Sequence, residues 1–319
     1  MKGGILLVFI LSSMAQAQRH NKRIRLKHSG GSADLIRIRQ LHLDSNAMQQ
    51  RIQHVCDTHS FIQCHTWKTL HYVVVHGQRT QNNPYVLFVF GQHARELFSS
   101  TTALAFIENI ARHRPKANII ILPNVNPIQR DKVLRGELCL RKNEHGVDLN
   151  RAYALPEFAT FVQYGQDSEE YQGDEPMTEV STQLVDFIVT SYPTRMVVNV
   201  HTGEFSAYVG GSDSSMTMHE PRDQQHVEIT KKVVADLCPQ CVVGPAASTS
   251  TYTATGTLCD YLKFIRHVPV AITFEIFGDF DRGKNCFEWF NPKTRADQDK
   301  YMRKWIMIFQ RLVDPDLMW

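Results

Sequence analysis

Short, continuous apolar runs along the chain predict buried β-strands. The clearest of them, residues 85–90, reads Tyr-Val-Leu-Phe-Val-Phe and is followed by Gly91. An apolar run of this length is too short for most helices and lacks the alternation of a half-exposed strand, so it is typical of a sheet covered on both faces. Further strands are predicted at residues 61–67, 69–75, 118–122, 196–200 and 268–276.

Longer segments with apolar residues at three- and four-residue intervals predict amphipathic helices between these strands. In residues 177–191, the positions expected to face inward are Val180, Leu184, Phe187 and Ile188. Other predicted helices cover residues 44–59, 97–111, 227–237 and 294–313. Because strands alternate with helices, we expect an α/β protein: a single domain with a mixed, mostly parallel central sheet flanked by helices on both faces.

The first residues carry the pattern of a secretory signal peptide. Residues 1–17 contain a lysine, a short apolar run and a terminal Ala-Gln-Ala, which is typical of a cleaved export signal. Residues 18–38 are rich in Lys and Arg and are expected to form a basic N-terminal tail, which leaves residues 39–319 as the folded domain. No later apolar stretch is long enough to span a membrane, so we expect a secreted, extracellular protein.

Composition and charge narrow the class of protein. Apolar residues make up 43% of the chain and charged residues 21%, which is typical of a globular domain. The net charge of +3 is small and no basic face with interleaved aromatic residues occurs, so a nucleic-acid partner is not indicated. Seven cysteines in an exported chain predict disulfide bonds and at least one thiol without a partner in the chain. The closely spaced candidates are Cys56 with Cys64 and Cys238 with Cys241.

Three potential metal ligands follow predicted strands. His93 and Glu96 come just after residues 85–90, and His201 directly follows residues 196–200. Because strands of an open α/β sheet place ligands at their carboxyl ends, these side chains can meet at one point. Two ligands close in sequence and one distant ligand are a frequent arrangement for catalytic zinc. Taken singly, each of the three could instead be a surface or turn residue.

Other residues have side chains that suit catalysis or the binding of an anion. Glu275 lies in an apolar run, where burial raises the pKa of a carboxyl and suits it to the role of general base. Arg141 could stabilise negative charge on a carbonyl oxygen, and the Asn150-Arg151 pair could bind a carboxylate through parallel hydrogen bonds. Each could instead form an ordinary surface contact.

Taken together and in this order, these residues resemble those of the zinc metallocarboxypeptidases of the pancreatic carboxypeptidase A and B type. The local context agrees, with His-Ala-Arg-Glu at 93–96, Pro-Asn-Val-Asn-Pro at 123–127 and Gly-Val-Asp-Leu-Asn-Arg at 146–151. The resemblance extends from about Leu41 to the last helix. Residues 39–319 would therefore be a metallocarboxypeptidase-like catalytic domain.

The resemblance implies a role for each residue. One Zn²⁺ would be bound by His93, Glu96 and His201. Glu275 would activate the zinc-bound water, and Arg141 would polarise the carbonyl group of the scissile peptide bond. Among the substrate-binding residues, Asn150, Arg151 and Tyr252 would bind the terminal carboxylate, and Arg95 would add positive charge nearby.

The pocket for the substrate's C-terminal side chain is also placed by the resemblance. Counting from Tyr252 puts Cys259 at its floor, and a neutral floor predicts a preference for apolar or aromatic C-terminal residues. Its walls would be Thr251, Ala254 and Thr273. A shift of one position would put Asp260 at the floor, and Asp213 or Glu204 could also reach in; any of these acids would reverse the preference.

Two features depart from the family pattern. Residues 202–204 read Thr-Gly-Glu, where the pancreatic enzymes have a serine and a tyrosine that help to shape substrate subsites. Cys139 matches a family cysteine in position, but the usual partner some two dozen residues later is absent.

The sequence therefore predicts a secreted, monomeric, zinc-dependent metallocarboxypeptidase that hydrolyses the C-terminal peptide bond of peptides and proteins. Two alternatives remain. The first is an aspartoacylase-like zinc amidohydrolase of small N-acyl amino acids, because such enzymes also use H-x-x-E and an Asn-Arg pair. The second is a non-catalytic, peptide-binding protein on the same scaffold.

Overall fold

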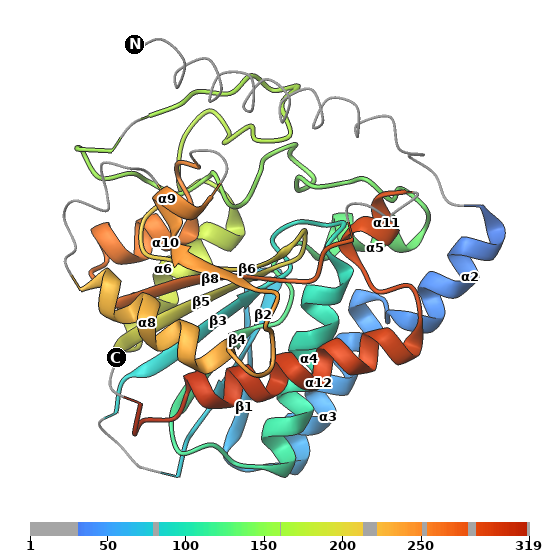
Figure 1. Cartoon of the computed structure of the whole chain (residues 1–319). Helices are drawn as coiled ribbons and strands as arrows, with labels where there is room; N and C mark the ends of the chain where they lie inside the picture. The colour runs from blue at the N-terminus through green and yellow to red at the C-terminus, as the bar shows by residue number, and fades with distance from the viewer. Residues whose placement is uncertain are drawn as a thin grey trace, which may run out of the picture.

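A mixed eight-stranded sheet forms the centre of the part of the chain that the structure describes (Figure 1). The structure is a computed structural model, and it describes residues 31–78, 83–159, 161–212, 222–250, 254–279 and 285–317. The strands follow the order β1-β2-β4-β3-β5-β8-β6-β7 across the sheet. This architecture confirms the predicted fold class, a single α/β domain.

The strands are β1 (Ile62–Trp67), β2 (Leu70–Val75), β3 (Tyr85–Phe90), β4 (Asn118–Leu122), β5 (Thr194–His201), β6 (Phe205–Val209), β7 (Val242–Pro245) and β8 (Val270–Ile276). The α-helices are α2 (Ser32–Leu41), α3 (Ser45–Thr58), α4 (Leu97–Arg112), α5 (Pro127–Leu134), α6 (Val180–Ser191), α8 (Asp223–Val234), α9 (Ala246–Thr249), α10 (Leu258–Asp260), α11 (Cys286–Phe290) and α12 (Arg295–Leu312). A short π-helix, η1 (Tyr261–Ile265), continues directly from α10.

The central strands are parallel, and this brings their carboxyl ends to one edge. Strand β3 pairs in parallel with both β4 and β5, and β5 pairs in parallel with β8. Antiparallel pairs, β1 with β2, β2 with β4 and β6 with β8, flank this centre. The apolar runs predicted at residues 85–90 and 118–122 are confirmed as the strands β3 and β4. Side chains on both faces of these strands are buried, as expected for a continuous apolar run.

Helices bury both faces of the sheet. On one face, apolar residues of α3, α4, α8 and α12 form a core with side chains such as Phe88 and Phe274. On the other face, α6, α10 and η1 pack against the alternate side chains, including Leu87 and Val197. This division follows from strand geometry, in which successive side chains point to opposite faces. Among the described residues, no helix is long and apolar enough to cross a membrane.

The structure corrects several details of the sequence prediction. Helix α2 lies partly within the predicted tail of residues 18–38, and Ile38 is buried against the domain, so the tail cannot extend to residue 38. Phe187 was expected to face inward but is 39% exposed, and its ring stacks on Trp67 at the surface. Residues 1–30, which include the predicted signal peptide, lie outside the described residues.

Three disulfide bonds join residues of the described chain. The bonds Cys56–Cys64 and Cys238–Cys241 confirm the two predicted pairs. The third, Cys139–Cys286, supplies the partner that Cys139 lacks in its own neighbourhood, across a sequence separation of 147. Cys259 keeps a free, buried thiol. The odd cysteine is thus the one predicted for the side-chain pocket.

Candidate active site

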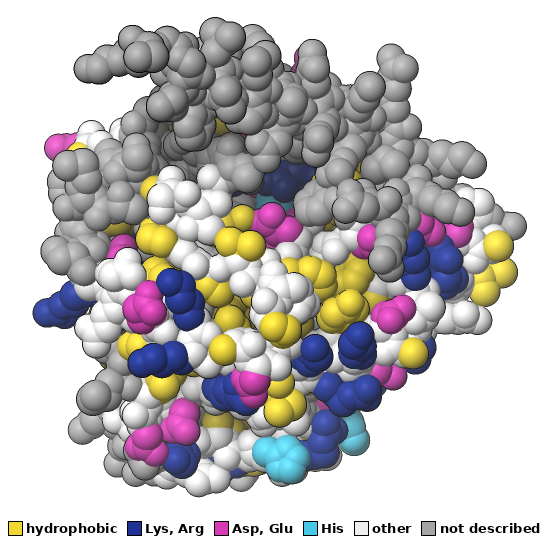
Figure 2. Space-filling view, viewed as in Figure 1, with side chains coloured by type: hydrophobic (Ala, Val, Ile, Leu, Met, Phe, Trp, Pro, Cys, Tyr) yellow, Lys and Arg dark blue, Asp and Glu magenta, His cyan; other side chains and the backbone are white. Residues whose placement is uncertain are grey.

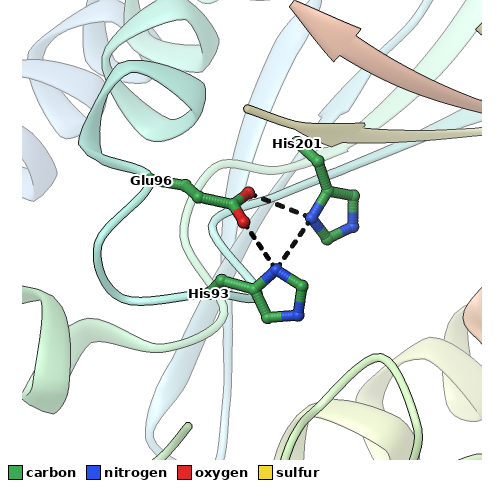
Figure 3. Close-up of side chains that lie close together, drawn as sticks. All are labelled: His93, Glu96 and His201. Atoms are coloured by element: carbon green, nitrogen blue, oxygen red, sulfur yellow. Dashed lines mark hydrogen bonds and ion pairs between the residues drawn. The ribbon is translucent and has the colours of Figure 1, made fainter. Parts of the chain in front are cut away.

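His93, Glu96 and His201 meet at the carboxyl ends of β3 and β5 (Figure 3). Nδ1 of His93 lies 2.7 Å from Oε1 of Glu96, and Nδ1 of His201 lies 3.0 Å from Oε2 of the same carboxylate. The two Nδ1 atoms are 3.1 Å apart. All three side chains are buried, and their ligand atoms lie within 4.8 Å of one another.

The local backbone explains how the first two ligands reach this point. Gly91 ends β3 with a φ of 72°, a conformation that other residues rarely adopt. A Cβ atom at Gly91 would also collide with Ser100 and lie 2.8 Å from Oδ1 of Asn124. Only glycine therefore allows the chain to turn here into the loop that carries His93. Glu96 is the residue that immediately precedes α4.

The Nε2 atoms of the two histidines point away from the three-ligand cluster, and each contacts a side-chain oxygen. Nε2 of His93 contacts Oδ1 of Asp148 at 3.0 Å, and Nε2 of His201 contacts Oε1 of Gln92 at 3.1 Å. Because both partners are acceptor oxygens, each Nε2 carries the proton and each Nδ1 turns a lone pair toward the other ligands. Two lone pairs and a carboxylate at contact distance fit a bound cation, and His₂Glu is a typical donor set for catalytic Zn²⁺.

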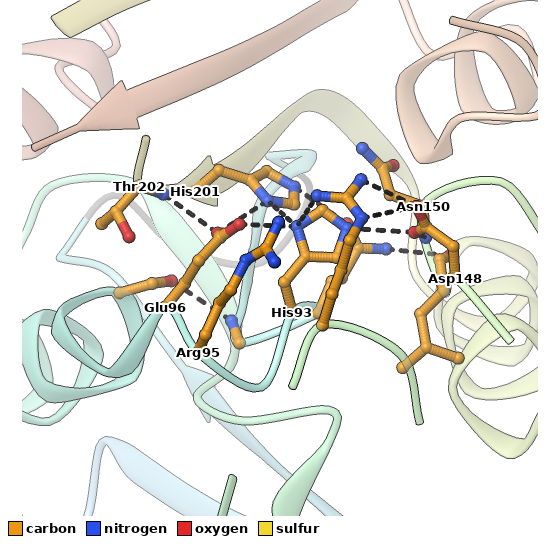
Figure 4. A network of polar contacts seen from close by, with 12 residues as sticks. His93, Arg95, Glu96, Asp148, Asn150, His201 and Thr202 are labelled. Carbon is orange, nitrogen blue, oxygen red and sulfur yellow. Dashed lines mark hydrogen bonds and ion pairs between the residues drawn. The ribbon is translucent and has the colours of Figure 1, made fainter. Parts of the chain in front are cut away.

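Asp148 is a residue of the site that the sequence analysis did not single out (Figure 4). Its side chain is 0% exposed, and its Oδ2 accepts hydrogen bonds from Nη2 and Nε of Arg141 at 2.7 and 2.9 Å. Burial opposes ionisation, but the charge of Arg141 and the contact with His93 hold the pKa of this carboxyl well below its usual value. Asp148 therefore fixes the position of a candidate metal ligand and of Arg141 together. In the sequence, the only indication of this role was the presence of a carboxylate within the Gly-Val-Asp-Leu-Asn-Arg segment.

Glu275 lies beside the three candidate ligands. It pairs with His201 in the register of β5 and β8, so both residues stand at the same edge of the sheet. Desolvation, followed by the charges of Glu96 and Glu204, raises the pKa of the Glu275 carboxyl well above its usual value. Its Oε2 has no hydrogen-bond partner among the described residues. Gly203 lies close to this carboxyl, because a Cβ there would be 3.4 Å from Oε2, which is van der Waals contact.

Asn150, Arg151 and Arg95 surround the same region. Oδ1 of Asn150 accepts a hydrogen bond from the backbone nitrogen of Leu258 at 3.0 Å, which fixes the orientation of its amide. The Arg95 guanidinium lies over the ring of Phe290, 4.5 Å from its centroid. Figure 2 shows His, Lys or Arg, and Asp or Glu side chains close together in a hollow on the viewed face, beside hydrophobic side chains.

Both of these arginines are paired with acidic residues that the sequence analysis did not single out. Arg95 donates two hydrogen bonds to Glu169, at 2.7 and 3.0 Å. Nη2 of Arg151 donates to Oε1 of Glu170 at 3.1 Å. Glu169 and Glu170 are adjacent in the long loop between α5 and α6. Nothing in their immediate sequence distinguishes them from ordinary surface acids.

The residues predicted for the side-chain pocket are only partly described. Tyr252 and Thr251 lie outside the described residues, as does Asp213. Cys259 is buried, with its Sγ 3.3 Å from Oγ1 of Thr273. Asp260, the alternative floor residue, is fully buried and accepts hydrogen bonds from the backbone nitrogens of Ser212 and Thr257 at 2.9 and 3.2 Å.

Known structures share this fold at low sequence identity. Carboxypeptidase A from Helicoverpa armigera is 16% identical with a TM-score of 0.72, and the match covers 85% of this chain and 73% of that one. Bovine thrombin-activatable fibrinolysis inhibitor, in complex with a tick carboxypeptidase inhibitor, is 17% identical with a TM-score of 0.70 over 85% of this chain and 96% of that one. At such identities, the likeness concerns the fold alone.

A model of the zinc carboxypeptidase family matches residues 11–295, which is most of the chain. No curated protein matches the sequence. The family match agrees with the resemblance to the pancreatic enzymes, with the fold and with the donor set of His93, Glu96 and His201. This chain belongs to the zinc carboxypeptidase family, whose members are zinc-dependent hydrolases.

Proposed function

We propose that the protein is a secreted metallocarboxypeptidase that removes the C-terminal residue of peptides, with Glu275 as its general base. The observation that supports this most directly is that Glu275 is paired with His201 on the adjacent strand, at the edge where the three candidate ligands meet. Zn²⁺ held by His93, Glu96 and His201 would polarise the substrate carbonyl and lower the pKa of water.

The other residues are assigned roles by their charge and their contacts. The Glu275 carboxyl, whose pKa is raised and whose Oε2 has no partner in the described chain, takes a proton from the attacking water and passes it to the leaving amine. Arg141, held by Asp148, stabilises negative charge that develops on the carbonyl oxygen. Because Asp148 fixes the guanidinium beforehand, little reorganisation is needed during the reaction.

Asn150, Arg151 and Tyr252 bind the terminal carboxylate of the substrate, and Arg95 adds positive charge nearby. A cavity of about 370 Å³ borders Arg151 and leaves room for a ligand beside it. A guanidinium binds a carboxylate through parallel hydrogen bonds, and an uncharged amide would leave it poorly paired. We therefore expect the enzyme to require a free C-terminal carboxylate.

The side-chain pocket prefers neutral apolar or aromatic residues in this proposal. Its support is that the carboxylate of Asp260 is already used: it forms a capping box with Thr257, the N-cap of α10, and also accepts a hydrogen bond from the backbone nitrogen of Ser212. Cys259 instead contacts Thr273. Comparison of two peptides that end in Phe and in Arg tests this assignment. Faster hydrolysis of the peptide that ends in Arg would mean that an acid, such as Glu204, lines the pocket.

Export and the monomeric state are part of the same proposal. Three disulfide bonds in the described chain support export, because such bonds persist in oxidising compartments. N-terminal sequencing of the protein released from eukaryotic cells should find a chain that begins after Ala17. Light scattering of that protein should give the mass of one chain.

The central experiment combines zinc analysis with hydrolysis of one peptide in two forms, as the free acid and as the C-terminal amide. We expect one zinc per chain and cleavage of the acid only. Equal rates on both forms would indicate an endopeptidase. Hydrolysis of N-acetyl amino acids without any hydrolysis of peptides would favour an aspartoacylase-like amidohydrolase. Zinc binding without hydrolysis of any substrate would favour a non-catalytic, peptide-binding protein.

A further inference from the structure

Glu170 forms an ion pair with Arg151, the residue that is proposed to bind the terminal carboxylate of the substrate. Its Oε1 accepts a hydrogen bond from Nη2 of Arg151 at 3.1 Å. The Arg151 side chain is only 2% exposed, whereas that of Glu170 is 28% exposed. A carboxylate of the protein itself therefore reaches this buried guanidinium from the side that is open to solvent. Chemically, this carboxylate resembles the free C-terminus of a peptide.

The loop that carries Glu170 is anchored to the segment that carries the site. Nζ of Lys142, the neighbour of Arg141, donates to the backbone oxygens of Gln166 and Ser168 at 2.7 and 2.9 Å. The backbone nitrogen of Asp148 donates to the oxygen of Tyr171 at 2.7 Å, on the other side of Glu170. Glu170 is thus held between two fixed points, and its pairing with Arg151 is a defined feature of the loop.

A substrate carboxylate that binds the Nη2 side of Arg151 competes with Glu170 for that group. Another nitrogen of the guanidinium, Nη1, already donates to the backbone oxygen of Asn150 at 2.8 Å. A buried arginine that loses its partner is costly, so Glu170 stabilises the guanidinium until a substrate arrives. Because Glu170 is partly exposed, its carboxylate can turn into water when another carboxylate takes its place.

We propose that Glu170 is an affinity-determining residue, whose carboxylate holds Arg151 in the free enzyme and is exchanged for the terminal carboxylate of the bound substrate. This inference rests on the proposed role of Arg151. The exchange occurs when the substrate binds and persists in the transition state. Its free-energy cost therefore weakens the binding of the substrate and of the transition state equally. Glu170 therefore raises KM and leaves kcat unchanged.

The test compares wild type with Glu170→Gln, whose amide oxygen can still accept a hydrogen bond from Arg151 but carries no charge. The probes are N-acetylphenylalanine, which has the carboxylate of a reaction product, and its amide, both measured as competitive inhibitors. For Glu170→Gln we expect about 1.5- to 5-fold tighter binding of the acid, the range of a partly exposed ion pair, with unchanged binding of the amide. KM for a peptide that ends in Phe should fall by the same factor at constant kcat.

Glu175→Gln is the matched control, because Glu175 is an exposed acid in the same loop. It removes the same charge and should leave affinity for the acid unchanged. Unchanged or weaker binding of the acid by Glu170→Gln, in an enzyme whose wild type prefers acid to amide, would overturn this inference. If wild type binds acid and amide equally, the role of Arg151 in the proposed function fails instead. A fall in kcat with the melting temperature maintained would make Glu170 a residue that positions Arg151, and would also overturn the inference.

Discussion

Oδ1 of Asp148 lies 3.0 Å from Nε2 of His93, so a fully buried carboxylate orients a candidate zinc ligand. The other oxygen of the same carboxylate holds Arg141, which couples the position of the metal to that of the cationic side chain expected at the substrate carbonyl. The positions of two side chains with separate proposed roles thus depend on one residue.

Asp148→Asn should leave both His93 and Arg141 less firmly positioned. The single oxygen of an amide cannot accept the hydrogen bonds from His93 and from Arg141 at the same time. Loss of such a partner typically lowers metal affinity by about 10- to 100-fold. We expect that loss in a competition assay against a chelator, together with a lower kcat at saturating zinc. Asp236→Asn, which removes an exposed carboxylate that pairs with Arg311, is the control. Wild-type zinc affinity and kcat in Asp148→Asn would contradict this account.

Replacement of any one of His93, Glu96 and His201 by Ala should remove bound zinc and abolish activity. A catalytic zinc site normally has three protein ligands, and the loss of one leaves too few to retain the ion at low free zinc. Zinc per chain after dialysis is the measurement. His145→Ala serves as the control, because His145 is an exposed histidine that contacts Glu179. Full zinc occupancy in all three ligand variants would refute the assignment.

Glu275→Gln should retain zinc and the wild-type melting temperature while kcat falls by roughly 10²- to 10⁴-fold. The amide has nearly the same shape as the carboxyl but cannot accept a proton, and this is the range that general-base catalysis contributes. Steady-state kinetics with a peptide that ends in Phe provide the measurement. Near-normal turnover would rule out Glu275 as the base.

Asp260 should make stability depend on pH in a direction opposite to that of most carboxylates. Burial raises its pKa to about 6, against about 3.9 in an unfolded chain. Because the folded state binds this proton more tightly, its contribution to stability is complete below about pH 4. It is lost as the pH rises to about 6. The free energy of unfolding of wild type, minus that of Asp260→Asn, should therefore fall by up to about 3 kcal/mol over this interval.

Urea denaturation of both proteins from pH 4 to pH 7 tests this expectation. The contribution of zinc and of all other groups is common to the two proteins and cancels in the difference. Parallel curves for the two proteins would show that Asp260 titrates as it does in the unfolded chain.

The central strands could be predicted because burial on both faces leaves a continuous apolar run. Strands β6 and β7 could not, since they are short and lie toward one side of the sheet, where β6 mixes Ser206 and Tyr208 with small apolar residues. Helix α2 could not be predicted within the basic segment, because its two buried apolar side chains, Ile38 and Leu41, are too few to make a visible period.

The candidate zinc ligands and Glu275 could be found because each stands at or near the end of an apolar strand. Asp148, Glu169 and Glu170 could not, since their significance lies in the arginines that they contact, and those arginines are distant or separated by a loop. The partner of Cys139 could not be predicted either, because the two cysteines are separated by 147 positions and no local sequence pattern links them.

The bond between Cys139 and Cys286 turns the intervening chain into a closed covalent ring, which contains Arg141, His201 and Glu275 but not His93 or Glu96. A single proteolytic cut inside this ring would leave both new ends attached to one molecule. Such a nicked protein would migrate as one band on a denaturing gel without reductant and as two bands with it. A cut between residues 97 and 138 would release two fragments under either condition. The response to reductant would therefore locate a cut relative to the ring.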